Sequence, residues 1–456
     1  MENRITGNRL IRLGYTPAPW FKSCLEHLNS VYTDKDSIII EVAEYYKKQY
    51  EDSLPKVEPL KEGVNYAIYY TPISGNEYDK DNLNKVLETM DEVMKHPRVV
   101  DGAILPDACP SGDVGTIPVG GMVTLESAIC PDMHSADICC SVMSTDLGRV
   151  PMISVMMSLK RFVHFGKGGR EDFLASEVLG SKVTDIISKF DKNNFTKGMG
   201  DKVVTHLGTC GDGNHFVFVG VSRATGNTVL VTHFGSRGVG AEVYKRGKNV
   251  AKKISSIIAP DLKGKNAYIP YESQEGQDYL EALYLVKEWT KLNHETVHTK
   301  VMRDLGINVS RPTVWTIHNF VQGITDSDGN PYFNHLKGAI NLQFPSEIGL
   351  IPLNMASPIL VVRKGFDCLG LSPHGAGRLV SRRKFKEDFG EDLRLFDKLN
   401  GLDINFFHGY PDFSELPQAY KDPSHIIKSI KEHNLVEVID TIEPYGCIMA
   451  GEVKEI

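Results

Sequence analysis

The sequence predicts a single domain in which helices and strands are mixed and in which distant strands build one cleft. Segments with apolar residues at helical spacing occur in several places, and apolar runs typical of strands lie between them. Chemically distinctive segments, most of them with a histidine, are spread from residue 137 to residue 374. No internal repeat or low-complexity tract divides the chain, so one domain accounts for this spread most simply.

Composition and charge place the chain among ordinary globular proteins. Its 456 residues are 41% hydrophobic and 24% charged, which allows a substantial core. It has no run of about 18 apolar residues and no secretory-signal pattern at its start, so we expect a soluble cytoplasmic protein without a membrane partner. Eight scattered cysteines suit a reducing compartment. The net charge of -7 argues against non-specific coating of nucleic acid, although a local basic cleft remains compatible with it.

Helical periodicity marks four regions. Residues 37–50 and 81–95 carry apolar stripes at helical spacing, and His96-Pro97 is expected to end the second helix. Residues 150–205 combine a helical pattern with many lysines, which is typical of a solvated surface, and residues 274–305 predict one or two long helices. We interpret all four regions as scaffold.

Two segments place acids or cysteines where a site is expected. The apolar run 99–105 predicts a buried strand, with Asp107 at its end, where site residues often lie. Asp137 and Cys140 are separated by two residues, so a carboxylate and a thiolate could meet one metal ion on a turn. Taken alone, the segment 128–142 is more typical of buried, inert cysteines. Both interpretations remain open at this point.

Apolar strands that deliver a histidine beside a glycine or an asparagine recur along the chain. They are 206–219 with Asn214 and His215, 229–240 with His233 and Arg237, and 314–319 with His318 and Asn319, followed by Lys337 after a turn. A lone histidine is usually a satisfied core residue. Repeated occurrence with access through small neighbours favours metal ligation.

The stretch around His374 sets a histidine among glycines and follows it with arginines. Gly375 and Gly377 add little bulk beside the ring, so a large ligand could approach it. Arg378 and Arg382 could bind phosphate oxygens bidentately, which makes His374 a candidate nucleophile toward phosphorus. A glycine-rich turn before a solvated basic helix is the simpler alternative.

Taken together, these segments resemble the RtcB family of RNA ligases, which join RNA 3′-phosphate or 2′,3′-cyclic phosphate ends to 5′-hydroxyl ends. The similar region covers roughly residues 81–451. Seven motifs stand in the family's order: Pro106-Asp107, Asp137-x-x-Cys140, Gly213-Asn-His-Phe216, His233-x-Gly-Ser-Arg-Gly238, His318-Asn319, Lys337-Gly-Ala339 and Ser372-x-His-Gly-Ala-Gly-Arg-x-x-Ser-Arg382. The resemblance implies one large α+β domain over 1–456, with residues 1–80 as an N-terminal elaboration. It also implies central β-sheets surrounded by helices and a deep metal-containing cleft.

The resemblance further implies two manganese ions that share one thiolate. Asp137, Cys140 and His215 would hold one ion, while Cys140, His233 and His318 would hold the other. Carboxylate and imidazole ligands suit manganese, whereas thiolate is softer than manganese usually prefers.

By the same resemblance, His374 attacks the α-phosphate of GTP and forms a histidine–GMP intermediate, with Asp107 orienting the ring. GMP then passes to the RNA 3′-phosphate, and the 5′-hydroxyl displaces it, in RNA repair or tRNA splicing. The implied phosphate- and RNA-binding residues are Arg237, Lys337, Arg378 and Arg382. The implied nucleotide-binding residues are Asn214, Phe218, Asn319, Pro352, Asn354, Met355, Ile359, Gly375, Ala376, Gly377 and Met449.

The sequence departs from the family's pattern in three places outside the base site. Cys109 stands where a histidine often follows the Pro-Asp pair, Asp132-Met-His-Ser135 replaces a Gly-Gly-Val-Gly, and an extra stretch precedes the similar region. The expected metal ligands and His374 are kept, which favours retained nucleotidyl transfer. The alternative is a metal-binding paralog that acts as a phosphoesterase or binds damaged RNA without joining ends.

Four positions at which the family recognises guanine also differ. The acid expected two residues after Phe216 is Phe218, the expected terminal lysine is Met449, and two expected serines are Asn354 and Ile359. Each lost polar contact weakens guanine selectivity by about 1 to 3 kcal/mol. We therefore expect that GTP is not strongly preferred over ATP, or that base contacts come from residues outside the family's motif.

Overall fold

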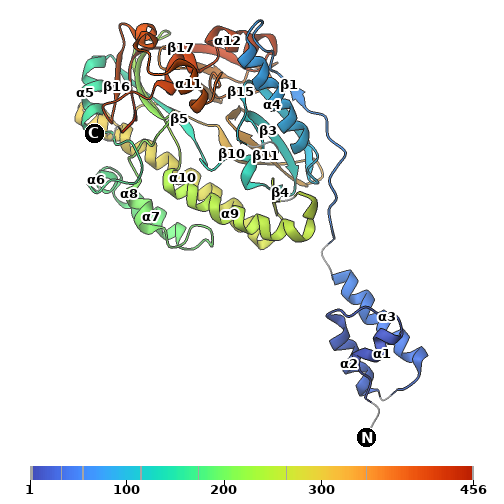
Figure 1. Ribbon diagram of the computed structural model, residues 1–456. Helices are drawn as coiled ribbons and strands as arrows, with labels where there is room; N and C mark the ends of the chain where they lie inside the picture. Colours follow the sequence, from blue (N-terminus) through green and yellow to red (C-terminus); the bar gives the residue numbers. More distant parts are fainter. Residues whose placement is uncertain are drawn as a thin grey trace. The chain divides into compact units, whose positions relative to one another are not determined.

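The computed structural model divides the chain into two compact units, Met1–Glu58 and Pro59–Ile456. The structure describes residues 4–31, 33–53, 56–112, 116–172, 174–262, 264–345 and 347–453. The described residues of the smaller unit form three helices, α1 (Gly7–Arg12), α2 (Trp20–Ser30) and α3 (Asp36–Ser53) (Figure 1). They pack around their own core, which includes Leu10, Trp20, Leu28 and Ile39. The helix predicted over 37–50 is confirmed as α3.

The larger unit begins earlier than the boundary at residue 80 that the sequence suggested. Strand β1 (Ala67–Ile68) pairs in parallel with β2 (Val99–Cys109), so residues before 80 are part of the larger unit's sheet. The helix predicted over 81–95 is observed as α4 (Glu77–Val93). It starts four residues earlier because the Asn76 side chain accepts a hydrogen bond from the Asp79 backbone N–H and caps the first turn.

Two sheets form the centre of the larger unit. The five-stranded sheet has the order β1-β2-β3-β11-β10 and is antiparallel apart from β1 and β2. Its other strands are β3 (Val119–Glu126), β10 (Asn319–Thr325) and β11 (Pro331–Lys337). The pairing of β2 with β3 is interrupted between Ile104 and Cys109, where Pro106 has no N–H to donate. The strand predicted over 99–105 therefore extends to Cys109, and Asp107 lies inside this irregular stretch.

The eight-stranded sheet curls until its edge strands approach each other. Its order is β13-β14-β17-β6-β7-β5-β9, and β16 pairs in parallel with β17. The strands are β5 (Ser141–Gly148), β6 (Phe216–Ser222), β7 (Thr228–Phe234), β9 (Thr313–Ile317), β13 (Ile348–Pro352), β14 (Ile359–Arg363), β16 (Asp403–Phe406) and β17 (Glu437–Met449). The Leu350 N–H donates to Thr316 Oγ1 at 3.1 Å and links β13 to β9. Two small ladders pair β12 (Ala339–Asn341) with β15 (Leu371–Pro373), and β4 (Ala128–Ile129) with β8 (Ile269–Pro270).

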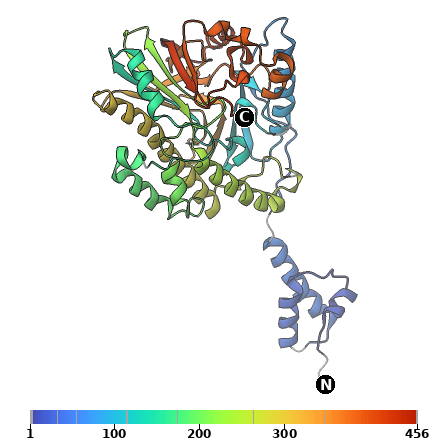
Figure 2. The same cartoon turned by 60° about the vertical axis from the view of Figure 1, so that its left-hand side comes forward.

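Helices cover the outside of the sheets. Helices α6 to α10 lie together along one side of the sheets in both views (Figures 1 and 2). The remaining helices are α5 (Met152–Phe162), α6 (Leu174–Leu179), α7 (Ser181–Phe190), α8 (Gly200–Thr205), α9 (Arg237–Ile258), α10 (Gln274–Asp304), α11 (Arg382–Phe389) and α12 (Pro423–Glu432). Short 3₁₀ helices are η1 (Pro131–Met133), η2 (Pro260–Leu262), η3 (Leu393–Leu399), η4 (Phe413–Glu415) and η5 (Pro417–Ala419). Residues 274–304 form one helix, not two.

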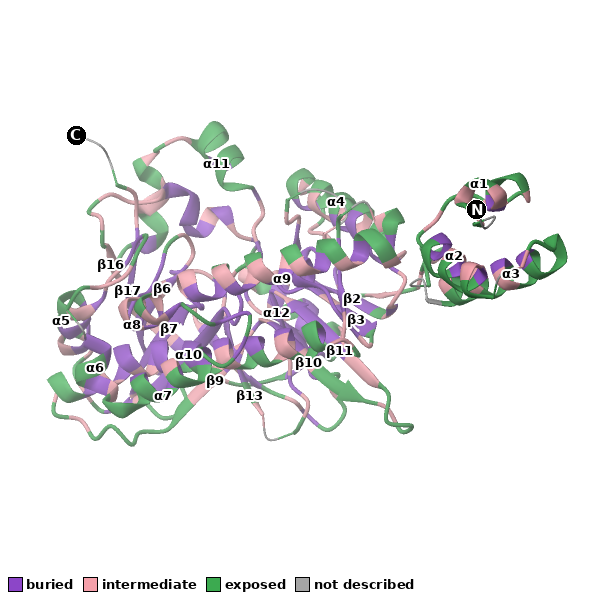
Figure 3. Cartoon of the chain, turned by 90° about the horizontal axis from the view of Figure 1, so that it is seen from below, coloured by how far each residue is buried: buried purple, intermediate pink, exposed green. Residues whose placement is uncertain are grey.

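Burial follows the predicted amphipathic pattern. In α7, Ile186 and Phe190 are buried, whereas Lys182 and Lys189 are exposed, so the lysine-rich surface predicted for residues 150–205 is confirmed there. Figure 3 shows the same division, with buried strands inside and exposed helix faces outside. These features confirm the predicted α+β fold with central sheets surrounded by helices.

All eight cysteines are free thiols. Within the part of the chain that the structure describes, no helix is both long and apolar enough to cross a membrane.

Candidate active site

One end of the eight-stranded sheet gathers three of the histidines that the sequence singled out, together with Cys140. Cys140 directly precedes β5, His215 directly precedes β6, His233 lies near the end of β7, and His318 directly follows β9. Strands β6, β7, β5 and β9 are consecutive neighbours, and the register sets His233 opposite Phe216. Adjacent strands in this register bring the four side chains to one place, although up to 178 positions separate them in sequence (318 − 140).

The potential ligand atoms converge. Cys140 Sγ lies 3.4 Å from Nε2 of both His215 and His233, and His233 Nε2 lies 3.3 Å from His318 Nε2. Asp137 Oδ2 lies 3.0 Å from His215 Nε2. Two groups could each hold a metal ion, one of Asp137, Cys140 and His215 and one of Cys140, His233 and His318. The five predicted ligands are therefore brought together, and Cys140 belongs to both groups.

The chemistry of these donors fits transition-metal cations. Burial lowers the pKa of His233 and His318 well below the ordinary histidine value, so both rings are neutral and can offer Nε2 lone pairs. Two such nitrogens at 3.3 Å need a shared proton or a cation between them. Burial raises the pKa of the Cys140 thiol, and a bound cation would favour the thiolate instead. His215 Nδ1 lies 3.1 Å from the Cys210 carbonyl, the outer hydrogen bond that ligating histidines usually make.

The backbone around the ligands adopts conformations that side chains rarely permit. Ser135, Cys139 and Arg237 have φ values of 76°, 58° and 54°, in the left-handed region, which is a strained arrangement often found at functional sites. At Gly235, an added Cβ would overlap the Asp137 carboxylate, so only glycine fits. Asn319 accepts from the Gly338 N–H at 2.7 Å and donates to the Asp137 carbonyl at 3.2 Å. It therefore braces the loop that carries Asp137 and does not line the pocket described below.

His374 is held beside this cluster by Asp107. The backbone N–H and the Nδ1–H of His374 both donate to Asp107 Oδ2, at 3.1 and 2.6 Å, and Asp107 is fully buried. Because a carboxylate can only accept, it places a proton on Nδ1, so the lone pair of a neutral ring would lie on Nε2. The His374 ring centroid lies 4.7 Å from that of His318. Gly377 has φ 74° and a Cβ there would overlap the Asp107 carbonyl, so this close approach requires glycine.

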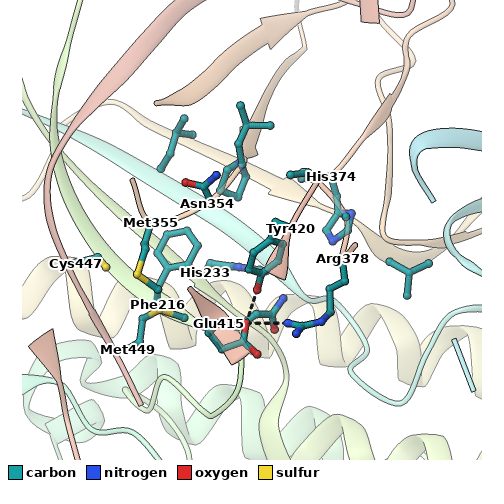
Figure 4. Close-up of a pocket in the computed structure, with 18 of the residues that line it drawn as sticks. Phe216, His233, Asn354, Met355, His374, Arg378, Glu415, Tyr420, Cys447 and Met449 are labelled. Atoms are coloured by element: carbon teal, nitrogen blue, oxygen red, sulfur yellow. Dashed lines mark hydrogen bonds and ion pairs between the residues drawn. The ribbon is translucent and has the colours of Figure 1, made fainter. Parts of the chain in front are cut away.

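A pocket with a volume of about 380 Å³ opens beside His374 (Figure 4), within the usual size range for small-molecule sites. Figure 4 shows His374 and Arg378 at one end and Met355, Cys447 and Met449 at the other. Arg382 pairs with the same carboxylate as Arg378, that of Glu415. The predicted nucleotide-binding residues that line it are Asn214, Phe218, Pro352, Asn354, Met355, Ile359, Gly375, Ala376, Gly377 and Met449. The pocket thus separates a basic end from an apolar end, as a nucleotide requires for its phosphates and its base.

Sequence reasoning missed Glu415, which organises the basic end. The buried Glu415 carboxylate pairs with Arg382 Nε at 2.6 Å and with Arg378 Nη1 at 3.3 Å, and it accepts from the Tyr420 hydroxyl (Figure 4). Arg378 also donates to the carbonyls of Ser414 and Val380. Its Nε and both terminal nitrogens are therefore bonded within the protein, whereas the Arg382 side chain is 50% exposed. Glu415 lies in no motif, so no local signal could have identified it.

The two other predicted phosphate-binding residues lie outside the pocket lining. Arg237 donates from Nε to Thr209 Oγ1 at 3.0 Å and from Nη2 to the Gly166 carbonyl at 2.5 Å. Lys337 ends β11, and burial lowers its pKa to about 8. Phe216, Tyr420 and Cys447 line the pocket without having been predicted as site residues.

Together, the fold and the site define an α+β protein with a buried cluster suited to metal ions next to a carboxylate-held histidine. Residues 170–450, more than half of the chain, match the family model described as "tRNA-splicing ligase RtcB", so the chain belongs to the RtcB family. The matched region contains His215, His233, His318 and His374. Asp107, Asp137 and Cys140 precede it, yet the fold brings them to the same site.

Individual relatives agree with this membership at modest identity. The chain is 26% identical to the tRNA-splicing ligase RtcB of Nanoarchaeum equitans over 286 residues, 53% of this chain and 59% of that protein. It is 27% identical to the RNA-splicing ligase RtcB1 of Escherichia coli over 256 residues, 53% of this chain and 61% of that protein. It is 26% identical to the tRNA-splicing ligase RtcB of Aeropyrum pernix over 326 residues, which are 62% of this chain and 66% of that protein. The chain thus spans less than two thirds of the length of these relatives.

Proposed function

We propose that the larger unit is a manganese-dependent RNA ligase that joins RNA 3′-phosphate or 2′,3′-cyclic phosphate ends to 5′-hydroxyl ends. The single observation that carries this proposal is the 2.6 Å hydrogen bond between His374 Nδ1 and Asp107, immediately beside the two overlapping ligand groups. That arrangement supplies an oriented nitrogen nucleophile next to a site for divalent cations. Family membership supports the same conclusion. We place the activity in the cytoplasm, in RNA repair or tRNA splicing.

In the proposed reaction, His374 Nε2 attacks the α-phosphorus of a nucleoside triphosphate, GTP in the family. An N–P bond forms, the bond from the α-phosphorus to the bridging oxygen breaks, and pyrophosphate leaves. Asp107 keeps the proton on Nδ1 and stabilises the ring as it becomes positively charged. The nucleotidyl group then passes to the RNA 3′-phosphate, and the 5′-hydroxyl displaces the nucleotide. Two manganese ions, held by Asp137, Cys140, His215, His233 and His318, would neutralise charge on the phosphates when bound.

Phosphate contacts are assigned by the same proposal to Arg237, Lys337, Arg378 and Arg382. Arg382 is the best placed of these, because it lines the pocket, is half exposed, and is oriented through Nε by Glu415. The terminal nitrogens of such a guanidinium can still bind phosphate oxygens.

The decisive experiment supplies the full chain with manganese and α-phosphate-labelled GTP. We expect an acid-labile covalent adduct, and then joining of an RNA that carries a 3′-phosphate to one that carries a 5′-hydroxyl. Release of phosphate from RNA without joining would instead support a phosphoesterase. Failure to form an adduct with any of the four nucleoside triphosphates, together with failure to join ends, would refute the proposed function.

We also expect that GTP is not strongly preferred over ATP, or that base contacts come from residues outside the family's motif. The apolar end of the pocket is lined by Phe218, Ile359 and Met449, and these side chains have no hydrogen-bonding groups that distinguish guanine from adenine. Competition among the four nucleoside triphosphates for adduct formation measures this. A preference for GTP over ATP above about a hundredfold, roughly 2.7 kcal/mol, would contradict the expectation.

A further inference from the structure

A buried lysine lies behind the Asp107–His374 pair and contacts both of the segments that carry it. Lys421 has no exposed surface. Its ammonium donates to the carbonyl oxygens of Pro106 at 3.1 Å and of Ala108 at 2.7 Å, the two residues that flank Asp107. The Lys421 backbone N–H donates to the Gly377 carbonyl at 3.0 Å. One residue therefore joins the Asp107 segment to the loop that follows His374.

The positive charge of Lys421 is matched by buried partners on other elements. Its Nζ lies 3.5 Å from Asp79 Oδ1, near the start of α4, and 3.6 Å from the centroid of the Tyr70 ring. Asp79 is fully buried and accepts from the Tyr70 hydroxyl and, at 2.7 Å, from the Ile73 N–H. The ammonium is thus surrounded by two carbonyls, a carboxylate and an aromatic face, which together can compensate its removal from water.

Lys421 lies where the β2–β3 ladder is interrupted, and there it donates hydrogen bonds that an apolar side chain could not donate. Pairing between β2 and β3 is interrupted from Ile104 to Cys109, so the ladder with β3 provides no register partners for residues 105–108. The Pro106 and Ala108 carbonyls are buried in this interruption and take hydrogen bonds from Lys421 instead. Buried ion pairs are often replaceable by apolar residues without loss of stability. An apolar residue would remove the Lys421 hydrogen bonds to both carbonyls and leave the position of Asp107 less well defined.

We propose that Lys421 is a positioning residue for the nucleophilic histidine and acts through the backbone on either side of Asp107. This inference rests on the proposed function of His374. Lys421 does not line the pocket, so it does not touch the nucleotide. Its role is to hold Asp107 Oδ2 where it meets His374 Nδ1 and the His374 backbone N–H. A misplacement of about 1 Å at such a pair lowers a reaction rate by roughly a hundredfold.

The test compares two variants, because the single substitution leaves Asp79 buried without its partner. Lys421→Met should lower the melting temperature, and Lys421→Met/Asp79→Asn should recover much of it by removing both charges. In both variants, at a temperature where the protein is folded, we expect the maximal rate of adduct formation to fall by roughly 30- to 100-fold. The GTP concentration for half-maximal rate and the content of bound manganese should stay within about twofold of wild type, since neither site contacts Lys421.

Lys61→Met is the matched control, because the Lys61 ammonium donates at 2.5 Å to the Val99 carbonyl at the opposite end of β2. It should leave the rate of adduct formation within about twofold of wild type. A folded double variant that forms the adduct at the wild-type rate would overturn the proposal. So would a loss of manganese or nucleotide affinity in step with the rate, which would indicate general disruption.

A second readout separates this inference from the proposed function. Proton NMR detects the hydrogen-bonded His374 Nδ1–H, identified by its disappearance in His374→Ala. We expect this signal to broaden or vanish in both Lys421 variants and to persist in Lys61→Met. If the wild-type protein forms no adduct, the proposed function fails while this readout still decides the positioning role. An unchanged signal in the folded Lys421 variants would refute that role.

Discussion

Replacement of Cys140 by alanine is expected to remove both manganese ions, whereas Asp137→Ala is expected to remove one. Cys140 Sγ lies within 3.4 Å of Nε2 of His215 and of His233, which belong to different ligand groups. Asp137 belongs to one group only. Loss of even an outer hydrogen-bond partner weakens metal binding by about 10- to 100-fold, and loss of a shared ligand should exceed that for both ions. RNA joining should therefore become undetectable in Cys140→Ala.

The measurement is the number of manganese ions bound per chain in each purified variant, after dialysis against a buffer that contains free manganese. Cys139→Ala is the matched control, since Cys139 is the neighbouring buried cysteine and belongs to neither ligand group among the described residues. It should retain two ions per chain. Two ions bound with wild-type affinity in Cys140→Ala would show that the thiolate is not shared between the sites.

His374→Ala is expected to abolish the nucleotide adduct while leaving both manganese ions bound. His374 belongs to neither ligand group, although its ring lies 4.7 Å from that of His318. Asp107→Asn should be less severe but still slow adduct formation by about 100- to 10,000-fold, because an amide at this position no longer holds the proton on Nδ1. The measurement is the amount of label from GTP that remains covalently bound after denaturation.

His433→Ala provides the control for histidine substitution. His433 lies at the end of α12, is partly buried, and contacts the ring of Tyr69 away from the pocket. Its adduct level should match that of wild type. A labelled adduct of wild-type size in His374→Ala would assign the nucleophile to another residue.

Much of the fold could be predicted because helices and strands are encoded by patterns a few residues apart. The stripe over 37–50 became α3, and 274–305 became the single helix α10. The less accurate boundaries depend on contacts that periodicity does not contain. Asn76 caps α4 earlier than its apolar stripe begins, and β2 continues past Pro106 to Cys109. Residues 59–80 belong to the larger unit, and their only strand, β1, pairs with β2 through just two residue pairs, which the sequence pattern does not reveal.

The candidate site shows the same division between local and long-range information. By itself the sequence determined which side chains are available, because Cys140, His215, His233, His318 and His374 each stand in a distinctive local motif. Only the tertiary structure decided how they combine: the strand order β6-β7-β5-β9 converts separate histidines into two ligand groups that share one thiol.

Glu415 and Lys421 carry no local signal at all. Glu415 reaches Arg378 across 37 positions, and Lys421 reaches the Ala108 carbonyl across 313. Such contacts depend on how strands and loops pack in three dimensions, and the free energy that selects them comes from burial and from satisfying buried polar groups. Neither quantity is contained in the few neighbouring residues that define a motif.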